Sequence, residues 1–324
     1  MKFSVLDTID PHYNLAVEEY LFSTSSEEVF LLWQNSPTVV IGKNQNAFAE
    51  INKPVLEKNG VKLARRITGG GAVYHDEGNV NYSFITPNAK TEGIDFSSYA
   101  EPILKALKTL GVTATLSGRN DIMVGDKKIS GNAQHRVGNR VLHHGTLLFS
   151  SDLGFLSSVL KVDETKLKSK AVKSTRSRVE NISSLIDKSL SVEDFIAYLS
   201  SFIIARYKPE IISVEDNPQI NALYERNKSI GWLYPDRTIV SDYTKTVKNR
   251  FSFGLVSIEL SMKNDEINGV KIEGDFFGVQ PIEELEDKLK GVKINDLSSV
   301  LSSVKVGDYI LGMENLDFIN LLLN

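Results

Sequence analysis

Three consecutive glycines follow a pair of arginines in this chain, and this segment constrains the fold more than any other. The segment runs from Arg65 to Asn79 and reads RRITGGGAVYHDEGN. Glycine runs cost backbone entropy, so a chain keeps them where the backbone approaches a neighbour closely or adopts a positive φ. Successive N–H groups in such a loop form a concavity that binds anions such as phosphate, and arginines add charged, planar donors. A glycine-rich hairpin beside a surface arginine pair is the alternative, and the segment alone favours neither.

A second polar stretch places a lysine pair before a short strand. Lys127 and Lys128 follow a Gly-Asp turn and precede Gly131. Neighbouring strand residues point to opposite faces, so one lysine can face inward while the other stays solvated. An inward lysine would supply a compact cation for an acidic ligand. Asp121 is a candidate ligand for Mg²⁺, which takes one or two carboxylates in nucleotide sites. The alternatives are a solvated lysine turn and a capping aspartate.

Length, charge and cysteine content limit the class of protein. The 324 residues predict two domains, or one large domain with a smaller partner. A net charge of −4 argues against a chain that binds nucleic acid along its whole length. The absence of cysteine excludes disulfides, Cys-ligated zinc, iron–sulfur clusters and a thiol nucleophile. We expect a cytoplasmic protein without a membrane span, because the chain lacks both a long apolar run and a signal-peptide core.

The hydrophobic pattern of the first two thirds predicts helices packed on a sheet. Asp10 caps a helix that begins at Pro11, Ser98 and Glu101 have capping-box spacing, and Ser191–Arg206 is amphipathic. The expected strands are Phe3–Leu6, Val29–Trp33, Thr38–Ile41, Val61–Arg65, Ala72–His75, Asn81–Thr86 and Val141–Phe149. Their order predicts a mainly antiparallel or mixed sheet rather than the regular βαβ succession of a Rossmann fold.

A change in composition predicts where the chain divides. Residues 208–246 are rich in Pro, Asn, Asp and Lys, so we expect a large domain over 1–246 and a small one over 247–324. The expected elements of the small domain are strands Leu255–Met262 and Val270–Ile272 and helices Ile282–Leu289, Ile294–Val300 and Leu316–Leu323. The fold class is therefore α+β, with mixed or antiparallel sheets flanked by helices in the large domain and a small α+β C-terminal domain. A domain this small has little core of its own and is expected to dock on the large one.

Taken together, these stretches resemble the lipoate–protein ligase family. The family's glycine-loop pattern is Arg-Arg-x-Ser-Gly-Gly-Gly-Ala-Val-x-His-Asp-x-Gly-Asn, and only Thr68 departs from it, keeping the hydroxyl. Gly118–Asp121 matches the family's Gly-Arg-Asn-Asp element, and Lys128–Ala133 matches Lys-[Ile/Val]-Ser-Gly-x-Ala. His143–Leu148 and Ser174–Val179 also resemble family blocks. The resemblance covers most of the chain, including the small C-terminal domain.

The resemblance implies a fold related to that of biotin ligases and a two-step reaction. Lipoate and ATP, with Mg²⁺, give lipoyl-adenylate and pyrophosphate, and a lysine amine of an acceptor protein then attacks the mixed anhydride. Both adenylation and transfer would belong to the large domain, with the small domain as an accessory. The implied acceptors are apo lipoyl domains of 2-oxoacid dehydrogenase E2 subunits, the glycine cleavage H protein, or both. We expect no nucleic-acid or membrane partner.

Matching positions carry the family's site residues onto this chain. Lys128 would be the catalytic residue, because it would contact both the lipoate carboxylate and the α-phosphate. Lys128, Gly131 and His144 would bind lipoate, and Asp121 would hold Mg²⁺. The implied residues for ATP or the adenylate are Arg66, Thr68, Gly69, Gly70, Gly71, Ala72, Val73, Tyr74, Asn79 and Lys128. A cation placed between a carboxylate and a phosphate offsets their mutual repulsion, so this role of Lys128 is physically sound.

Three further features have a functional and a structural interpretation. His75 and His144 are expected to support the loop walls by hydrogen bonding rather than to bind metal, because His144 and its neighbour His143 point to opposite faces. The candidate walls of an apolar slot for the lipoyl chain are Val73, Tyr74, Phe84 and Leu147. The basic run of Lys166, Lys168, Lys170, Lys173, Arg176 and Arg178 is either a solvated face or a surface that attracts acidic acceptors or ATP phosphates.

Other functions remain open at this stage. A lipoyltransferase that uses preformed lipoyl-AMP would carry the same motifs, and a non-catalytic module would bind a small acid, a nucleotide or a partner domain without turnover. Biotin ligase is less favoured because the glycine loop lacks the Gly-Arg-Gly-Arg pattern of that relative. The octanoyl and lipoyl transferases of the superfamily form a thioester on cysteine, which this chain cannot do.

Overall fold

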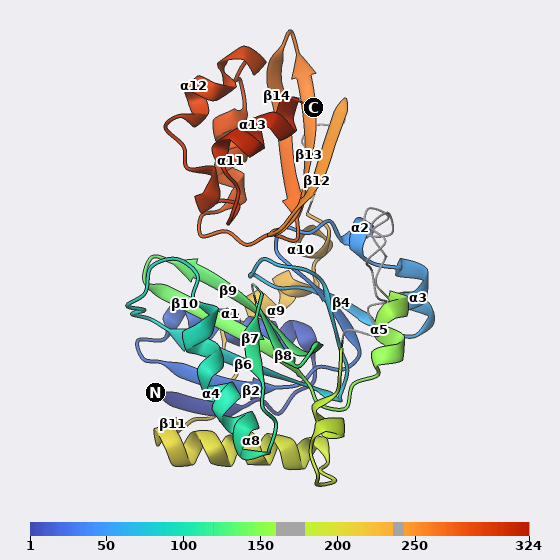
Figure 1. Cartoon of the computed structure of the whole chain (residues 1–324), viewed down its shortest axis with the longest axis vertical. Coiled ribbons are helices and arrows are strands. Elements are labelled where there is room, and N and C mark those ends of the chain that lie inside the picture. The colour runs from blue at the N-terminus through green and yellow to red at the C-terminus, as the bar shows by residue number, and fades with distance from the viewer. Residues whose placement is uncertain (119, 160–178, 236–242, 324) are drawn as a thin grey trace.

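The structure is a computed structural model that describes residues 1–118, 120–159, 179–235 and 243–323. Two bodies make up the molecule, a large domain built on an eight-stranded sheet and a C-terminal domain that lies above it (Figure 1). Both combine helices with sheet, so the predicted α+β class is confirmed. Among the described residues, no helix combines the length and the apolar character needed to cross a membrane.

Each strand and helix predicted for the large domain is present with small shifts at its ends, but the domain also contains elements that were not predicted, such as the helix Pro218–Lys228. Its strands are β1 Lys2–Val5, β2 Val29–Trp33, β3 Thr38–Ile41, β4 Lys62–Arg65, β5 Val73–His75, β6 Asn79–Thr86, β7 Thr115–Ser117, β8 Asp121–Val124, β9 Lys127–Val137, β10 Arg140–Leu148 and β11 Glu210–Ile211. Its helices are α1 Pro11–Thr24, α2 Ala47–Glu50, α3 Lys53–Lys58, α4 Phe96–Thr109, α5 Leu153–Val159, α8 Val192–Tyr207, α9 Pro218–Lys228 and α10 Ile230–Leu233, with a 3₁₀ turn at Ile182–Leu185.

Parallel and antiparallel pairs are mixed in the large sheet, as the sequence predicted. The strand order is β11-β1-β2-β6-β10-β9-β8-β7. β1 runs parallel to both of its neighbours, whereas β10 runs antiparallel to both β6 and β9. A separate three-stranded sheet, in the order β4-β3-β5, stands beside it and carries the glycine loop between β4 and β5.

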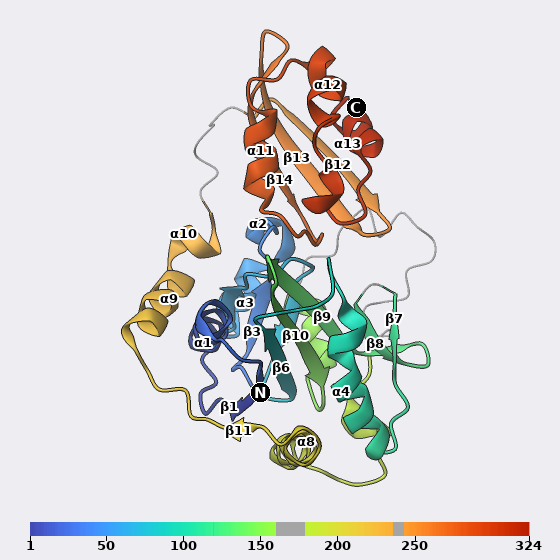
Figure 2. The same ribbon diagram turned by 90° about the vertical axis from the view of Figure 1, so that its left-hand side faces the viewer.

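Helices cover both faces of the large sheet, and each face has its own core. On one face α4 and α8 pack against the sheet through side chains such as Ile103 and Phe195. On the other, α1 and α9 pack through Leu15 and Ile220. Figure 2 shows the sheet between α1 and α4. Because the sheet is covered on both sides, a polar group on it must find a partner inside the protein.

Helix α4 begins earlier than the capping-box spacing predicted. Asp95 is its N-cap, and the Asp95 carboxylate accepts hydrogen bonds from the N–H groups of Ser97 and Ser98. An aspartate is as good a cap as serine, and starting here brings Phe96 into the buried helix face. The predicted cap at Ser98 was therefore wrong. Past the other end of the helix, Gly111 adopts φ +85°, the left-handed conformation that glycine favours after a helix C-terminus.

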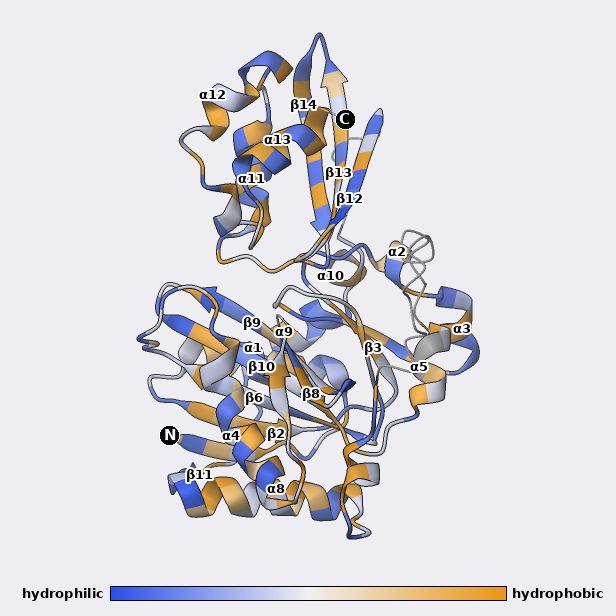
Figure 3. Ribbon diagram, in the orientation of Figure 1, coloured by the Kyte–Doolittle hydropathy of each residue, from blue (hydrophilic) through white to orange (hydrophobic). Residues whose placement is uncertain are grey.

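The C-terminal domain is a three-stranded antiparallel sheet with helices on one face. Its elements are β12 Lys245–Phe251, β13 Gly254–Lys263, β14 Glu266–Gly274, α11 Ile282–Leu289, α12 Leu297–Leu301 and α13 Asn315–Leu323, with 3₁₀ turns at Ile294–Asp296 and Val306–Asp308. Figure 3 shows hydrophilic and hydrophobic residues alternating along β13 and β14. Asn264 and Asp265 adopt positive φ in the tight turn between these strands, as their residue types favour. The predicted basic run from Lys166 to Arg178 lies outside the described residues.

Candidate functional site

The glycine loop is shaped by close backbone contacts. A Cβ on Gly42 would lie 2.2 Å from the carbonyl oxygen of Gly70, and one on Gly69 would lie 2.5 Å from that of Phe276. Gly70 has φ +91°. Gly71 differs, because a Cβ there would meet only the Asp275 side chain, at 3.9 Å. Close contacts with described neighbours thus explain why positions 69 and 70 are glycine. At Gly71 the absence of a side chain leaves space against the backbone that a ligand can use.

Arg66 is fully buried and holds the loop in shape. Its Nη2 donates to the carbonyl oxygens of Gly69 and Gly71, both at 2.8 Å, and its Nε donates to Thr68 Oγ1 at 2.8 Å. Its Nη1 donates to the carbonyl oxygen of Val40 on β3 at 3.1 Å. Burial lowers the pKa of Arg66 to about 10, so the guanidinium stays charged at neutral pH. Arg66 thereby places a permanent positive charge directly under the glycine loop.

A hydrogen-bonded chain connects Arg66 to helix α1. Because Arg66 Nε can only donate, the Thr68 hydroxyl oxygen accepts that bond, and His144 Nε2 lies 2.9 Å from the same oxygen. His144 Nδ1 then carries the proton that faces Glu18, at 2.9 and 3.0 Å from the two carboxylate oxygens. Ser83 donates to the same carboxylate at 2.6 Å. The chain fixes the glycine loop against β10 and α1.

An irregularity in the pairing of β8 with β9 sets the direction of the Lys128 side chain. β8 and β9 pair Ile122 with Ser130 but Met123 with Lys128, so β9 contains one extra residue. Such a bulge re-aims the side chains that flank it. The Lys128 ammonium consequently lies 2.9 Å from where a Gly131 Cβ would be. Its partner is Asp121, whose Oδ1 is 2.7 Å from Nζ.

Strand pairing shows that Lys128 and the glycine loop share one side of the sheet. Ala133 pairs directly with His144, and Gly131 lies two residues along β9, so both point to the His144 side. The Gly131 N–H also donates to Thr146 Oγ1, at 3.1 Å. Lys128, Gly131, His144 and, through His144, Thr68 are therefore gathered on the α1 side of β9 and β10.

The remaining predicted nucleotide residues lie in or beside β5 and β6. Val73 packs toward the α1 core, whereas Ala72 and Tyr74 pack toward α2, α3 and α5. Tyr74 is buried against Phe155, with ring centroids 5.4 Å apart, and burial raises its pKa to about 12. Asn79 is fully buried at the start of β6, where its Nδ2 donates to Asn81 Oδ1 at 2.9 Å.

Two of the candidate wall residues lie elsewhere. Leu147 and Phe84 pack in the core under α4 and α8, on the sheet face opposite to His144. Leu147 follows His144 by an odd number of residues, so the strand alternation forces this outcome. Leu147 and Phe84 therefore do not share a sheet face with His144 and the glycine loop.

Four contributors to the site were missed at the sequence level. Glu18 holds His144, Asn35 Nδ2 lies 3.0 Å from His75 Nδ1, and Phe276 and Phe277 of the C-terminal domain touch the glycine loop. A signal existed for Glu18, because it is an acid on the apolar face of α1. For Phe276 and Phe277 no local signal exists, because the contact joins segments far apart in the sequence.

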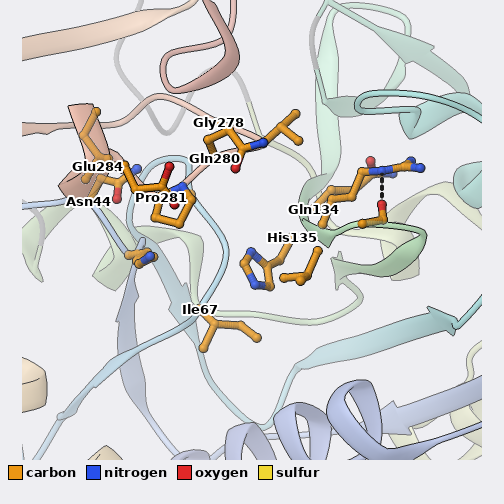
Figure 4. A pocket seen from close by; sticks show the side chains of 15 residues that line it. Asn44, Ile67, Gln134, His135, Gly278, Gln280, Pro281 and Glu284 are labelled. Atoms are coloured by element: carbon orange, nitrogen blue, oxygen red, sulfur yellow. Dashed lines mark hydrogen bonds between the residues drawn. The ribbon is translucent and has the colours of Figure 1, made fainter. Parts of the chain in front are cut away.

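The C-terminal domain closes over the glycine loop. The Gly70 N–H donates to the carbonyl oxygen of Phe276 at 3.1 Å, and the buried Phe277 ring packs against Gly70. Between the domains lies a cavity of about 250 Å³, whose walls include Ile67, His135 and Gln280 (Figure 4). Burial, with the nearby Lys43 charge, lowers the pKa of His135 to about 4, so its imidazole is neutral.

A glycine loop held by a buried arginine, with a lysine on the same side of the central sheet, fits the class of enzymes that activate a carboxylate with a nucleotide. The lipoyl protein ligase A/B catalytic domain family matches residues 10–203, and the bacterial lipoate protein ligase C-terminus family matches residues 241–322. This chain belongs to the lipoate–protein ligase family.

Curated relatives and solved structures agree with that assignment. The chain is 38% identical to lipoate-protein ligase LplJ of Bacillus subtilis over 97% of each chain, and 40% identical to lipoate–protein ligase 1 of Staphylococcus aureus over 90% of each. LipL1 of Plasmodium falciparum in complex with lipoate superposes with a TM-score of 0.77 at 28% identity, over 99% of this chain and 97% of that one.

Two further solved structures match about three quarters of this chain. A bipartite lipoate protein ligase of Thermoplasma acidophilum, studied with its E2 lipoyl domain, has a TM-score of 0.63 at 28% identity, over 74% of this chain and 98% of that one. A lipoate-protein ligase A bound with ATP has a TM-score of 0.59 at 26% identity, over 72% and 98%.

Proposed function

We propose that this chain is an ATP-dependent lipoate–protein ligase that joins lipoate to a lysine of an acceptor domain through lipoyl-adenylate. The observation that carries the proposal is that Lys128 and the Thr68–His144 attachment of the glycine loop lie on the same side of β9 and β10. Relatives named as lipoate–protein ligases, and neighbours solved with lipoate and with ATP, support it.

In the first step, a lipoate carboxylate oxygen attacks the α-phosphorus of ATP, an O–P bond forms and pyrophosphate leaves. Two anions meet in this step, and the Lys128 ammonium offsets their repulsion and the charge that develops on the phosphorus oxygens. The space at Gly71 lets a phosphate approach the backbone. His144 and Gly131 flank the lipoate carboxylate on the same sheet face.

In the second step, the amine of the acceptor lysine attacks the acyl carbon of lipoyl-adenylate. An amide bond forms, and AMP leaves with the electron pair of the broken C–O bond. No protein nucleophile takes part, which agrees with a chain that has no cysteine. The acceptors are apo lipoyl domains of 2-oxoacid dehydrogenase E2 subunits, the glycine cleavage H protein, or both.

The loop residues divide into those that shape the site and those that contact the nucleotide. Arg66 acts from beneath, because its Nη2 binds the Gly69 and Gly71 carbonyl oxygens, and Thr68 supports it by joining Arg66 to His144. The contacts to ATP or to the adenylate come from Gly69, Gly70, Gly71, Ala72, Val73, Tyr74 and Lys128, and Asn79 supports this segment from β6.

Asp121 is the residue that fits Mg²⁺. Its carboxylate is half-buried beside Lys128, and Mg²⁺ in nucleotide sites takes one or two carboxylates together with phosphate oxygens. Bound there, the ion neutralises phosphate charge. Among the described residues no group of three metal-ligating side chains gathers, which is consistent with an ion held largely by the nucleotide.

The division of labour is part of the same proposal. Residues 1–246 form the catalytic domain for adenylation and transfer, and residues 247–324 form the accessory domain; this boundary falls within β12, Lys245–Phe251, two residues after the strand begins. The enzyme acts in the cytoplasm, where a chain without cysteine has no need of disulfides.

The direct test is to incubate the full chain with ATP, Mg²⁺, lipoate and an apo lipoyl domain. We expect lipoyl-adenylate, pyrophosphate and a lipoylated domain, all followed by mass spectrometry. Lipoate-dependent exchange of labelled pyrophosphate into ATP separates this enzyme from a transferase that requires preformed lipoyl-AMP. Binding of lipoate or ATP by calorimetry without any turnover would identify a binding module and refute the proposal.

Lys128→Ala is the sharpest single variant for this reaction. Loss of one preorganised charge at the developing transition state lowers the rate by about 10²–10³-fold, so we expect pyrophosphate exchange to fall by that factor. Lys127→Ala is the matched control, because Lys127 is the neighbouring lysine on the same strand. Circular dichroism should show both variants folded. Full activity of folded Lys128→Ala would refute the role assigned to Lys128.

A further inference from the structure

Asn132 is a buried asparagine beside Gly131, but its side chain lies on the sheet face opposite to His144. In the ladder between β9 and β10 it pairs with Gly145. A Cβ on Gly145 would lie 2.3 Å from Asn132 Oδ1 and 2.6 Å from the Tyr82 ring. Glycine at position 145 therefore leaves the space that the Asn132 amide occupies, on the far side of the sheet from the site.

The neighbours of the Asn132 amide determine which way it points. The Asp95 N–H donates to Gln134 Oε1 at 3.0 Å, so Gln134 turns its Nε2 donor to His143 Nδ1, 3.0 Å away. Burial holds the pKa of His143 well below its usual range, so the ring is neutral. With Nδ1 accepting, its proton sits on Nε2, 3.2 Å from Asn132 Oδ1. The Tyr82 hydroxyl donates to the same oxygen, so Asn132 Nδ2 must point the other way.

The donor side of the Asn132 amide holds Asn120, the residue before β8. Asn132 Nδ2 donates to the Asn120 carbonyl oxygen at 3.0 Å, and the Asn132 N–H donates to the same oxygen at 2.9 Å. In return, Asn120 Nδ2 donates to the Asn132 carbonyl oxygen at 2.5 Å. We call these three hydrogen bonds the asparagine clasp. It fixes the main chain at the point where β8 begins.

The asparagine clasp lies one residue from the ion pair of the site. Asp121 follows Asn120 directly, and its Oδ1 lies 2.7 Å from Lys128 Nζ. Both side chains of this pair are partly exposed, at 37% and 31%. A partly exposed lysine on a flexible stem keeps its ammonium in one place only where its partner is itself fixed. The clasp supplies that fixed point for Asp121.

We propose that Asn132 is a positioning residue that sets where Asp121 and, through it, the Lys128 ammonium lie, although its own side chain faces away from the site. The consequence for the rate rests on the proposed ligase function, whereas the link from Asn132 to Asp121 does not. Lys128 acts where two anions are brought together, so a displaced ammonium lowers kcat more than it raises the KM for either substrate.

Hydrogen–deuterium exchange of the full chain tests the link without any substrate. In Asn132→Ala we expect a peptide over 120–124 to exchange about five- to tenfold faster, because the clasp loses one buried hydrogen bond and keeps two. Peptides from β1 and β2 should stay unchanged. The matched control is Asn227→Ala, because Asn227 is equally buried and its Nδ2 donates to a main-chain carbonyl oxygen, that of His12 at 3.0 Å, but on α9. Unchanged exchange over 120–124 in Asn132→Ala, or an equal increase there in Asn227→Ala, would overturn the proposal.

A double-variant cycle in lipoate-dependent pyrophosphate exchange tests the route through Lys128. With rates normalised to folded protein, we expect Asn132→Ala to lower kcat on the order of tenfold and to change the KM for lipoate and for ATP by less than about twofold. In the Lys128→Ala background the same substitution should change the rate by less than about twofold, because no ammonium remains to be displaced. Asn227→Ala should leave the rate unchanged in both backgrounds.

The outcomes of the cycle separate this inference from the proposed function. A tenfold loss in both backgrounds, an unchanged kcat, or a change confined to KM would contradict the positioning role. If the unmodified chain shows no pyrophosphate exchange while the 120–124 peptide responds to Asn132→Ala, the proposed function fails and the link from Asn132 to Asp121 stands.

Tyr82→Phe covers the case in which Asn132→Ala does not fold. It keeps the ring in the core under α4 and α8 and removes one of the two donors that orient Asn132 Oδ1. We expect exchange over 120–124 to become about two- to threefold faster and kcat to fall by a similar factor, because the bond from His143 remains. An unchanged 120–124 peptide in folded Tyr82→Phe would overturn the inference.

Discussion

The interiors of the two domains are built on different principles. The core of the C-terminal domain is a single apolar cluster, and the buried polar residues recorded in its described part are Ser261 and Glu286. The large domain buries arginines, histidines, asparagines and Glu18 beside its apolar cores. Burying a polar group lowers the stability of the fold unless that group is paired. An interior rich in such groups therefore indicates a region whose side chains are kept for chemistry rather than for stability. The C-terminal domain gives up little stability in this way, which suits an accessory body.

The largest effect is expected from a variant that interrupts the hydrogen-bonded chain from Arg66 to Glu18 in the large domain. Thr68→Val keeps the volume but leaves Arg66 Nε and His144 Nε2 without their shared partner. We expect a loss of about 1–3 kcal/mol in the free energy of unfolding and a fall in kcat/KM on the order of 100-fold, because the glycine loop loses its attachment to β10. Urea unfolding and steady-state ligation measure the two effects.

Two control variants accompany Thr68→Val. Thr38→Val removes an equally buried hydroxyl that donates only to the Ser36 carbonyl oxygen, at 2.6 Å, so the activity should persist. Thr68→Ser keeps the hydroxyl and should also retain activity. Wild-type rates in Thr68→Val would show that the chain from Arg66 to Glu18 does not support the reaction.

Acid should weaken the large domain more than the C-terminal one. Burial lowers the pKa of His75 to about 3, that of His135 to about 4, and that of His143 well below its usual value. The unfolded chain therefore takes up these protons first, and stability falls as pH drops below about 6.5, by about 1.4 kcal/mol per pH unit for each histidine. His135→Gln should reduce the change in unfolding free energy per pH unit by the contribution of one histidine, as measured by denaturant titrations at several pH values. A slope unchanged by this variant would contradict the assignment.

The smallest expected effect has the opposite sign and belongs to the C-terminal domain. Burial raises the pKa of Glu286, although Lys271, 3.2 Å away, and the Ile272 N–H at 2.7 Å oppose the shift. The folded state thus binds the proton of the Glu286 carboxyl more tightly than the unfolded state does. The contribution of Glu286 to stability therefore declines as pH rises from 4.5 through the raised pKa. Over that pH range, the stability of Glu286→Gln should increase relative to that of the parent chain, measured as the difference between their unfolding midpoints. A difference that shrinks as pH rises would refute the sign.

The elements and the fold class were predictable because hydrophobic periodicity is local. The position of Lys128 was only half predictable: alternation says that one lysine of the pair faces inward, but the extra residue in β9 decides where Lys128 points, and no residue type announces it. Glu18 was predictable in principle, since an acid between Leu15 and Leu21 on the apolar face of α1 must have a partner.

Other parts of the site depend on contacts that the sequence does not display. The Gly70–Phe276 hydrogen bond joins two main chains, so neither side chain signals it. The start of α4 was misplaced because two acceptable caps, Asp95 and Ser98, lie within one turn, and the burial of Phe96 decides between them. Local rules thus give the elements, and tertiary packing sets their ends and their partners.

Two adjacent residues of helix α1 bind side chains in different parts of the large domain. Glu18 points inward to His144, and Glu19 points outward to Arg226 of α9. Each residue of an α-helix is turned about 100° from the one before it. A single inserted residue between the Asp10 cap and Glu18 would rotate both carboxylates away from their partners at once. We therefore expect the length of this stretch to be nearly immutable when the enzyme is engineered by insertion or permutation.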